Sequence, residues 1–313
     1  MAQGQISQVK NPAAKTGRVS GRRSLIRRWM RKIHKSRPLA FLLLLLISAV
    51  ILLPIVFTFL YSFFPKSEIS AFLNQRGSYD SAKWMDVLFS PAMVSLRQYY
   101  TILIEEPQYL QLFCNSVLYA FGILAGQALV IPLTAYGLSR FTFKGRDALF
   151  FAVLMLMLLP FQVTMAPSVM TLRAIGLLNT PWAVILPMVF SPFYLFLLRQ
   201  FMIAIPGEIV EAGQMDGAGT FRTYIHVMLP VCKPILCAAA ALSFADCWNL
   251  VEQPLIYLTN RSMQPLSVMF NQISDESAGV AFAGSALYLL PMLLIYIYFQ
   301  DDIVLGVQLS ELK

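Results

Sequence analysis

The sequence predicts an all-α integral membrane protein with six transmembrane helices. Of its 313 residues, 58% are hydrophobic and only 13% are charged, which is not the balance of a soluble domain. Apolar runs of about 20 residues, the length that crosses a bilayer as a helix, recur along the chain. These runs are continuous rather than alternating. They therefore exclude a β-barrel and indicate a helical bundle, which satisfies its own backbone in lipid.

Charge and hydropathy divide the chain into segments. The apolar runs lie near 40–63, 113–138, 148–170, 182–201, 230–258 and 280–299. The predicted segments are a basic cytoplasmic tail (1–38), a first transmembrane helix (39–64), an external loop (65–112), a five-helix core (113–300) with a polar loop at 206–230, and a C-terminal cytoplasmic tail (301–313).

Positive charge is concentrated at the amino-terminal end. Residues 1–38 hold 11 of the 24 Lys and Arg and no Asp or Glu. Because basic segments stay on the cytoplasmic side of a membrane, this tail predicts a cytoplasmic amino terminus. Six spans then return the carboxyl terminus to the same side. The loop at 139–147 is also basic and agrees with this orientation. The charge is thus a topology signal and not a nucleic-acid footprint.

Within the tail, RRSLIRRWMRKIHKSR places apolar residues among cations at helical spacing. Two interpretations stay open: a helix that lies on the anionic inner leaflet, or a plain charge anchor without stable helix. A secretory signal is not expected, because the apolar run that follows is a full span without a small-residue cleavage site.

One polar interruption separates the fourth and fifth apolar runs. Residues 206–234 read PGEIVEAGQMDGAGTFRTYIHVMLPVCKP. Pro206 suits the first turn of a short helix that carries Glu208 and Glu211 one turn apart. Asp216 suits the cap of a second helix. Small residues at Gly213, Gly217 and Gly219 leave the bend without bulk. The pattern predicts either an ordinary loop between membrane helices or an elbow that another protein grips closely.

The motifs of catalytic and metal-binding sites are missing from the sequence. No Gly-rich loop ends in Gly-Lys-Ser/Thr, and neither an HExxH motif nor a nucleophile elbow occurs. The four cysteines lie in or beside apolar runs and suggest neither a metal site nor a disulfide. We therefore expect no catalytic residue, metal or cofactor in this chain. If ATP drives the protein, its hydrolysis must occur in another polypeptide.

The polar loop resembles the cytoplasmic EAA loop of bacterial ABC-importer permeases. The matching residues are Glu211-Ala212, Asp216-Gly217-Ala218, Leu229-Pro230 and Pro234. Further stretches resemble the family in its own order, namely NSVLYAFGILAGQALVIPLTAYGLSRFTFKGRDALFF from Asn115, residues 158–187, and FADCWNLVEQPLIYL at 244–258. Together they cover roughly residues 95–300. The chain is similar to the permeases of the carbohydrate-uptake ABC family, in particular the six-span subunit of the maltose-type pair.

That resemblance implies an ABC-importer type I permease bundle in the bacterial plasma membrane, together with its partners. A second permease subunit would complete the pathway, and two ATPase subunits would hold ATP and Mg²⁺. An extracellular solute-binding protein would deliver a sugar or oligosaccharide. In the loop, Glu211 would meet a cation of the ATPase and Gly217 would form the bend. The full set of expected coupling residues is Glu208, Glu211, Ala212, Gly213, Asp216, Gly217 and Ala218.

The sequence also departs from the family pattern. Gly213 stands where an alanine is usual, which is a mild change. Asp301 and Asp302 follow the last span, where the family has a basic, Gly-rich tail, so tail contacts with the ATPase are in doubt. Asp246 and Glu252 stand where uncharged residues are more common.

Polar residues at membrane depth are candidates for the translocation pathway. Along a continuous helix, Asp246, Asn249 and Gln253 would form one stripe, and the acid alone would cost about 3 kcal/mol against lipid. We therefore expect the stripe to face the pathway or the partner permease. Glu252 lies off the stripe and is expected to pair instead with Trp248, one turn back, which makes it the better candidate for an interface or an outer-leaflet position. Two further candidates, which could bind sugar hydroxyls or hold helices together, are Gln127 and Gln162.

Two other functions stay open. The same architecture could import a non-sugar solute such as a peptide or a glycerol phosphodiester, although the spans contain almost no cations that would suit a strongly anionic solute. A membrane scaffold without transport is the third hypothesis, and it gives no reason for an elbow of this kind.

Overall fold

The computed structural model describes residues 38–74, 91–270 and 278–311, and all regular structure in these ranges is helical. The chain divides into two units, Met1–Phe57 and Thr58–Lys313, which we describe separately. The described part of the first unit is the beginning of α2 (Pro38–Tyr61), an apolar helix where the sequence predicts the first span. The predictions for the basic tail, including its amphipathic helix, lie outside the described residues.

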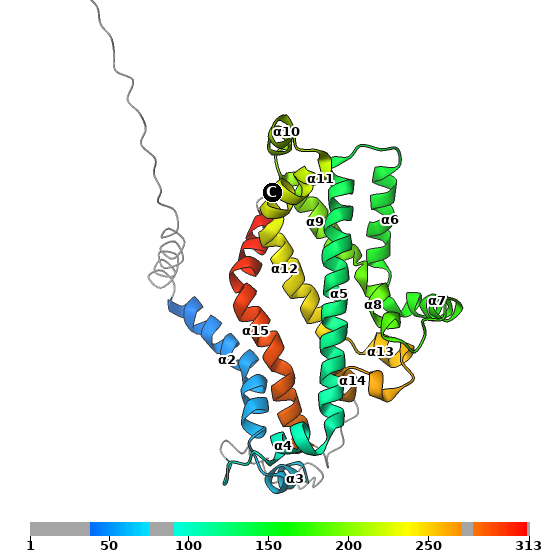
Figure 1. Cartoon of the computed structure of the whole chain (residues 1–313). Coiled ribbons are helices and arrows are strands. Elements are labelled where there is room, and N and C mark those ends of the chain that lie inside the picture. Colours follow the sequence, from blue (N-terminus) through cyan, green and yellow to red (C-terminus); the bar gives the residue numbers. More distant parts are fainter. Residues whose placement is uncertain (1–37, 75–90, 271–277, 312–313) are drawn as a thin grey trace, which may run out of the picture. The chain divides into compact units, whose positions relative to one another are not determined.

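The second unit is a bundle built around α5 (Figure 1). Helices α8, α9 and α12 pack against α5, and α15 packs along α12. Gly126 lets α5 approach α8 closely, because a Cβ added there would lie 2.4 Å from Cγ2 of Val189. The long elements are α5 (Pro107–Arg140), α8 (Pro181–Val189), α9 (Pro192–Ala204), α12 (Leu229–Trp248) and α15 (Ala278–Glu311).

In the described ranges, five helical stretches are long and apolar enough to cross a membrane. They are Ala40–Tyr61, Pro107–Arg140, Pro181–Ala204, Thr220–Trp248 and Ala278–Ile303. A bent pair, α6 (Arg146–Leu158) and α7 (Phe161–Ala174), makes six if it is counted as one span. The two helices meet at 106°, so the apolar run predicted at 148–170 is a bent pair of helices and not one continuous helix. The cause is Pro160, which holds the preceding Leu159 in an extended conformation and ends α6.

The continuous helix predicted at 230–258 is also interrupted. Helix α12 stops short of this range's end, and α13 (Glu252–Tyr257) begins after a short break. Pro254 has no N–H to donate to the carbonyl of Leu250. That carbonyl accepts a hydrogen bond from the hydroxyl of Ser267 instead. A side chain from a distant segment thus replaces a helical bond, which lets the chain leave the helix.

Short helices and the start of α5 occupy the described parts of the predicted external loop, 65–74 and 91–112. Helix α15 continues past the predicted end of the last span at residue 300. The buried amide of Gln98 donates to the carbonyl of Phe64 at 2.6 Å and ties two of these segments together. The elements at this end of the unit are α3 (Lys66–Asn74), α4 (Arg97–Tyr100), a π-helical turn (Thr101–Glu105), a 3-10 turn (Arg261–Met263) and α14 (Leu266–Phe270).

At the opposite end of this unit lies the polar segment 206–220, which we call the elbow (Figure 1). It begins with α10 (Gly207–Met215) and reaches the first residue of α11 (Thr220–Thr223). A π-helical turn (Tyr224–Met228) then leads directly into α12. The end of α5 and the start of α6 lie at the same end of the bundle as the elbow.

Candidate functional site

The elbow turns on a glycine at the end of α10. Gly217 has a φ of +81°, a left-handed conformation that residues with a side chain rarely adopt. Its amide donates to the carbonyl of Gln214 at 2.9 Å, and the amide of Ala218 donates to the carbonyl of Gly213 at 3.1 Å. These two bonds form a Schellman motif, which satisfies the last carbonyls of a helix. The structure therefore places Gly217 at the bend.

Asp216, Gly219 and Gly213 lie around this turn, each in a different role. Asp216 is the C-terminal cap of α10, whereas Gly219 precedes the first residue of α11. The prediction that Asp216 caps the second helix is wrong, because the Schellman turn separates it from α11. Gly213 lies against the π-helical turn, where an added Cβ would lie 3.3 Å from Cγ2 of Val227. Small size at this position lets α10 fold back closely.

Helix α10 and the start of α11 expose both carboxylates and apolar side chains. Val210 is buried and holds the helix to the bundle. Met215 exposes 87% of its surface and, beyond the bend, Phe221 exposes 66%. Glu208, Glu211 and Ala212 are also exposed. Exposed Met and Phe beside carboxylates give a projecting surface of the kind that partner proteins cover, with cations to meet the acids.

The last turns of α5 hold both ends of the elbow. The Nη2 atom of Arg140 donates to the carbonyls of Met202 and Ile205, at 2.7 and 2.8 Å. These carbonyls lie where α9 ends and the elbow begins. On the exit side, the hydroxyl of Tyr136 donates to the carbonyl of Thr220 at 3.4 Å. Arg140 belongs to the basic loop 139–147, which predicted only the orientation of the chain in the membrane. An arginine at the end of a long apolar run also suits the capping of helix carbonyls.

A second arginine makes the reciprocal contact. Arg199 on α9 is 7% exposed, and its Nε atom donates to the carbonyl of Leu138 in the last turn of α5 at 3.3 Å. Its guanidinium lies over the ring of Phe150, 3.7 Å from the centroid, and 4.0 Å from the carboxylate of Asp147. Each helix thus caps the other with an arginine. Arg199 was not among the predicted site residues, and its signal in the sequence is a lone cation within the apolar run FYLFLLRQF.

A polar pair joins α9 and α12. The hydroxyl of Tyr194 on α9 donates to Oδ2 of Asp246 on α12 at 2.7 Å. Asp246 is exposed at the surface of this chain, although it lies within an apolar helix. The acid therefore faces outward from the bundle, where the tyrosine of its own chain donates to it. Tyr194 was not among the predicted pathway residues. It stands in a run of Phe and Leu, where a tyrosine gives little indication of a polar site.

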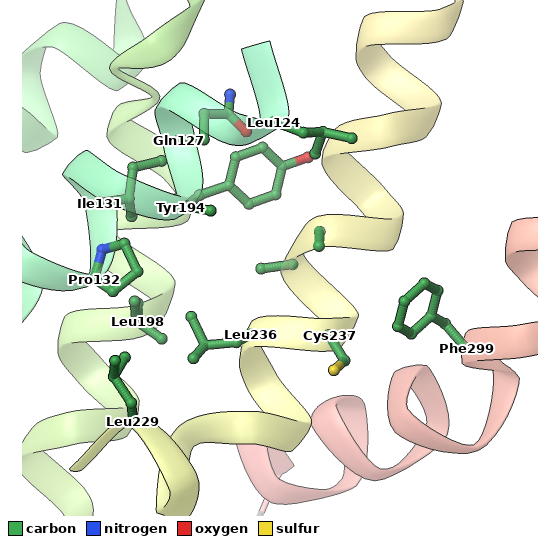
Figure 2. A pocket seen from close by; sticks show the side chains of 13 residues that line it. Leu124, Gln127, Ile131, Pro132, Tyr194, Leu198, Leu229, Leu236, Cys237 and Phe299 are labelled. Carbon is green, nitrogen blue, oxygen red and sulfur yellow. The ribbon is translucent and has the colours of Figure 1, made fainter. Parts of the chain in front are cut away.

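A cavity of about 380 Å³ lies beside this pair, between α5, α9, α12 and α15 (Figure 2). Its lining is apolar apart from Gln127 and Tyr194. Gln127 is buried, and its amide nitrogen donates to the carbonyl of Met188 on α8 at 2.8 Å while its oxygen accepts from the hydroxyl of Ser243 on α12. These bonds join α5, α8 and α12, as expected of a residue that holds helices together. Gln127 also lines the cavity, and its role in the pathway stays a prediction.

The break after α12 removes the predicted stripe. Asn249 is the C-terminal cap of α12, and its side-chain nitrogen donates to the carbonyl of Ala245 at 2.9 Å. Gln253 belongs to α13 and is half-buried. The prediction that Asp246, Asn249 and Gln253 share one helical face is therefore wrong. Gln162 lies on α7 and is exposed, away from the other candidates in the fold.

The predicted pairing of Glu252 with Trp248, one turn back, is wrong for the same reason. Glu252 is exposed in the first turn of α13. Trp248 is 1% exposed, and its ring stacks on that of Tyr288 with centroids 5.3 Å apart. The indole donates to the carbonyl of Tyr288 at 3.1 Å, so this tryptophan fixes the end of α12 to α15.

Comparison with known proteins identifies the family. The model of the family described as "Binding-protein-dependent transport system inner membrane component" matches residues 119–301, more than half of the chain. The chain belongs to this family. The matched region contains the elbow, the polar pair and the cavity. The resemblance to ABC-importer permeases is thereby confirmed, and the apolar helices are those of an inner-membrane transport component.

Curated relatives and a solved structure agree with this membership. An arabinooligosaccharide transport system permease protein of Halalkalibacterium halodurans is 28% identical over 270 residues, 85% of this chain and 93% of the relative. A diacetylchitobiose uptake system permease protein of Streptomyces coelicolor is 32% identical over 198 residues, 61% of this chain and 66% of the relative. An sn-glycerol-3-phosphate transport system permease protein of Yersinia enterocolitica is 30% identical over 212 residues, 66% and 75% of the two chains.

The solved structure is that of a bacterial ABC transporter involved in the import of alginate, an acidic polysaccharide. One of its chains superposes with a TM-score of 0.72 at 20% identity, covering 87% of this chain and 97% of the other. This likeness confirms the predicted fold class, an all-α bundle of the ABC-importer permease type.

Proposed function

We propose that this chain is one of two permease subunits that form the pathway for ATP-driven uptake of a sugar or oligosaccharide. Two ATPase subunits bind ATP and Mg²⁺ and dock on the elbow, and an extracellular binding protein delivers the solute. Relatives named for arabinooligosaccharides and diacetylchitobiose support the solute class. A relative named for sn-glycerol-3-phosphate supports a second candidate, a phosphorylated polyol.

The observation that carries this proposal is the exposed elbow. Its apolar and acidic side chains project from one end of the bundle, and the Schellman turn at Gly217 fixes their direction. A helix held this rigidly passes a push from the ATPase to the spans, whereas a loose loop would absorb it. Nucleotide-driven closure of the ATPase pair would then switch the bundle between two packings by rigid-body movement.

The polar pair supplies the candidate pathway. A charged side chain at membrane depth costs about 3 kcal/mol against lipid, so Asp246 has to face water or the partner permease. With Tyr194 it offers one hydroxyl and one carboxylate to solute hydroxyls. A carboxylate there disfavours anionic solutes, which favours an uncharged sugar over the phosphorylated candidate.

Both termini lie in the cytoplasm in this proposal, and so does the elbow. Single cysteines at Lys144, in the loop after α5, and at Thr259, at the other end of the bundle, test it in a chain whose four native cysteines are replaced by alanine. A membrane-impermeant maleimide added outside intact cells should label Thr259→Cys and leave Lys144→Cys unlabelled. Labelling of Lys144→Cys from outside would reverse the orientation.

The direct test of the function is co-purification. The tagged chain, expressed with the transport genes of its own operon, should bring down a second permease and an ATPase in detergent. Elbow variants should release the ATPase while keeping the permease. A tagged chain that brings down neither protein, although it is inserted and abundant, would favour the scaffold hypothesis.

A further inference from the structure

We infer that Tyr136 and Arg140 form a clamp that makes α5 move with the elbow. Both residues belong to the end of α5, and they hold the chain on either side of α10. They are positioning residues, because they act through the elbow rather than on solute or nucleotide. The inference rests on the proposed function, since it assigns the structural part that receives the push of the ATPase.

The entry side of the clamp is buried and strongly bonded. Met202 is fully buried and Ile205 is 7% exposed, so water cannot satisfy their carbonyls easily. Helix α9 ends here, and the amide of Ile205 reaches the carbonyl of Met202 only at 3.4 Å, so the last carbonyls of the helix are weakly bonded by the chain's own amides. One nitrogen of Arg140 supplies both with charge-assisted hydrogen bonds. Because Pro206 begins the elbow directly after Ile205, little free chain remains between the clamp and α10.

Arg199 locks the same two helices from the other side. Its bond to Leu138 and its contact with Phe150 hold α9 against the last turn of α5. With Arg140 bonded to α9 in return, two arginines cross between the helices. Sliding of one helix past the other would break bonds of both.

The exit side is closed by Tyr136. This residue is 4% exposed, and its ring lies 5.1 Å from that of Tyr224, in the turn that leads into α12. Its hydroxyl reaches the carbonyl of Thr220 at the start of α11. The elbow therefore cannot swing about one end alone, because both of its ends are fixed to one helix.

The clamp connects the elbow to the polar residues of the bundle. Gln127 lies on the same helix as Arg140, about 20 Å nearer the middle of the bundle at 1.5 Å per residue. It bonds to α8 through Met188 and to α12 through Ser243. A push on the elbow would be carried along α5, which stays helical through Pro132, and would shift Gln127 and with it the wall of the cavity.

Hydrogen exchange on the purified complex in nanodiscs tests this, with ATP, Mg²⁺ and vanadate as the only ligands. In the wild type, exchange should change on nucleotide binding both in the elbow, 206–220, and in the middle of α5, 120–132. In Arg140→Gln the elbow should still respond, while the response of α5 falls about tenfold or more, because the loss of one hydrogen bond to a charged group has about that effect and Arg140 donates two. Arg140→Lys, which keeps one cation near the carbonyls, should fall between the two.

Arg146→Gln is the matched control. Arg146 lies in the same region, and within the described part of the chain its side chain bonds only to Asp147 and the carbonyl of Phe141, next to its own position in the sequence. Tyr136→Phe removes one hydroxyl and keeps the ring, so it tests the clamp even if Arg140→Gln fails to fold. An unchanged α5 response in both clamp variants would overturn the inference. Loss of the elbow and α5 responses together would also overturn it, since these residues would then only stabilise the fold. If the wild-type chain purifies without an ATPase, the proposed function itself is contradicted. That result is obtained before any clamp variant is compared, so the two failures are distinguishable.

Discussion

Two glycines of the elbow allow a controlled test of its geometry. A Cβ added at Gly217 or at Gly219 meets no described atom within 4 Å, so neither substitution creates a clash. The two positions differ in backbone conformation: φ is +81° at Gly217 and −65° at Gly219. Gly217→Ala therefore introduces backbone strain alone, and Gly219→Ala is its matched control.

The strain sets the size of the effect. An L-residue in the left-handed region costs roughly 1–2 kcal/mol, which is a factor of about 5 to 30 in an equilibrium. In Gly217→Ala this cost opposes the Schellman bonds to Gln214 and Gly213, so the end of α10 should open more often. At Gly219 alanine fits the native φ, and such changes are neutral or stabilise slightly through the unfolded chain.

Hydrogen exchange of the purified chain measures the opening directly. We expect the backbone amides at positions 217 and 218 to exchange about 5 to 30 times faster in Gly217→Ala than in the wild type. Gly219→Ala should stay within about twofold of the wild type. The abundance of both variants in the membrane should be normal. Equal exchange rates in the two variants would show that the left-handed turn does not hold the elbow.

Three further predictions concern packing, pathway and docking. Gly126→Ala adds a methyl group 2.4 Å from Cγ2 of Val189, so the melting temperature should fall by an amount equivalent to about 1–3 kcal/mol of stability. Val189→Ala in the same chain should restore part of the loss. An unchanged melting temperature would contradict the close packing of α5 and α8. Asp246→Asn should alter uptake or solute preference in an assembled complex, whereas Glu252→Gln should leave both unchanged. Normal and equally selective uptake by Asp246→Asn would show that Asp246 has a structural role and does not line the pathway. Glu211→Lys should lower ATPase co-purification about tenfold or more without loss of insertion, and full co-purification would remove Glu211 from the contact.

The spans and the elbow could be predicted because they depend on local sequence. Continuous apolar runs report membrane depth directly, and they located α2, α5, α9, α12 and α15. The small residues of the elbow likewise report a bend, since Gly217 is the residue that a left-handed turn requires. The helix that Asp216 caps was harder to predict. An aspartate suits either end of a helix, and only the Schellman bonds show that it caps the end of α10.

The breaks in the predicted spans could not be read from hydropathy. The sequence stays apolar through Leu159 and Pro160, so the 106° bend leaves no mark on hydropathy, and only the proline itself indicates where α6 ends. At the end of α12, the chain leaves the helix because Ser267 satisfies Leu250 from a segment far along the sequence. The arginine contacts of α5 and α9 are hidden for the same reason, since Arg199 and Leu138 meet only when the two helices are packed.

ATP hydrolysis by the reconstituted complex tests the central claim most directly. In proteoliposomes that contain both permeases and the ATPase, maltose-, lactose- or arabinotriose-loaded binding protein should stimulate hydrolysis, and the purified chain alone should hydrolyse nothing. Stimulation should fall in Glu211→Lys, where the ATPase loses its hold on the elbow. Hydrolysis by the purified chain alone, or equal stimulation of the wild type and Glu211→Lys, would contradict a permease that is driven through this elbow.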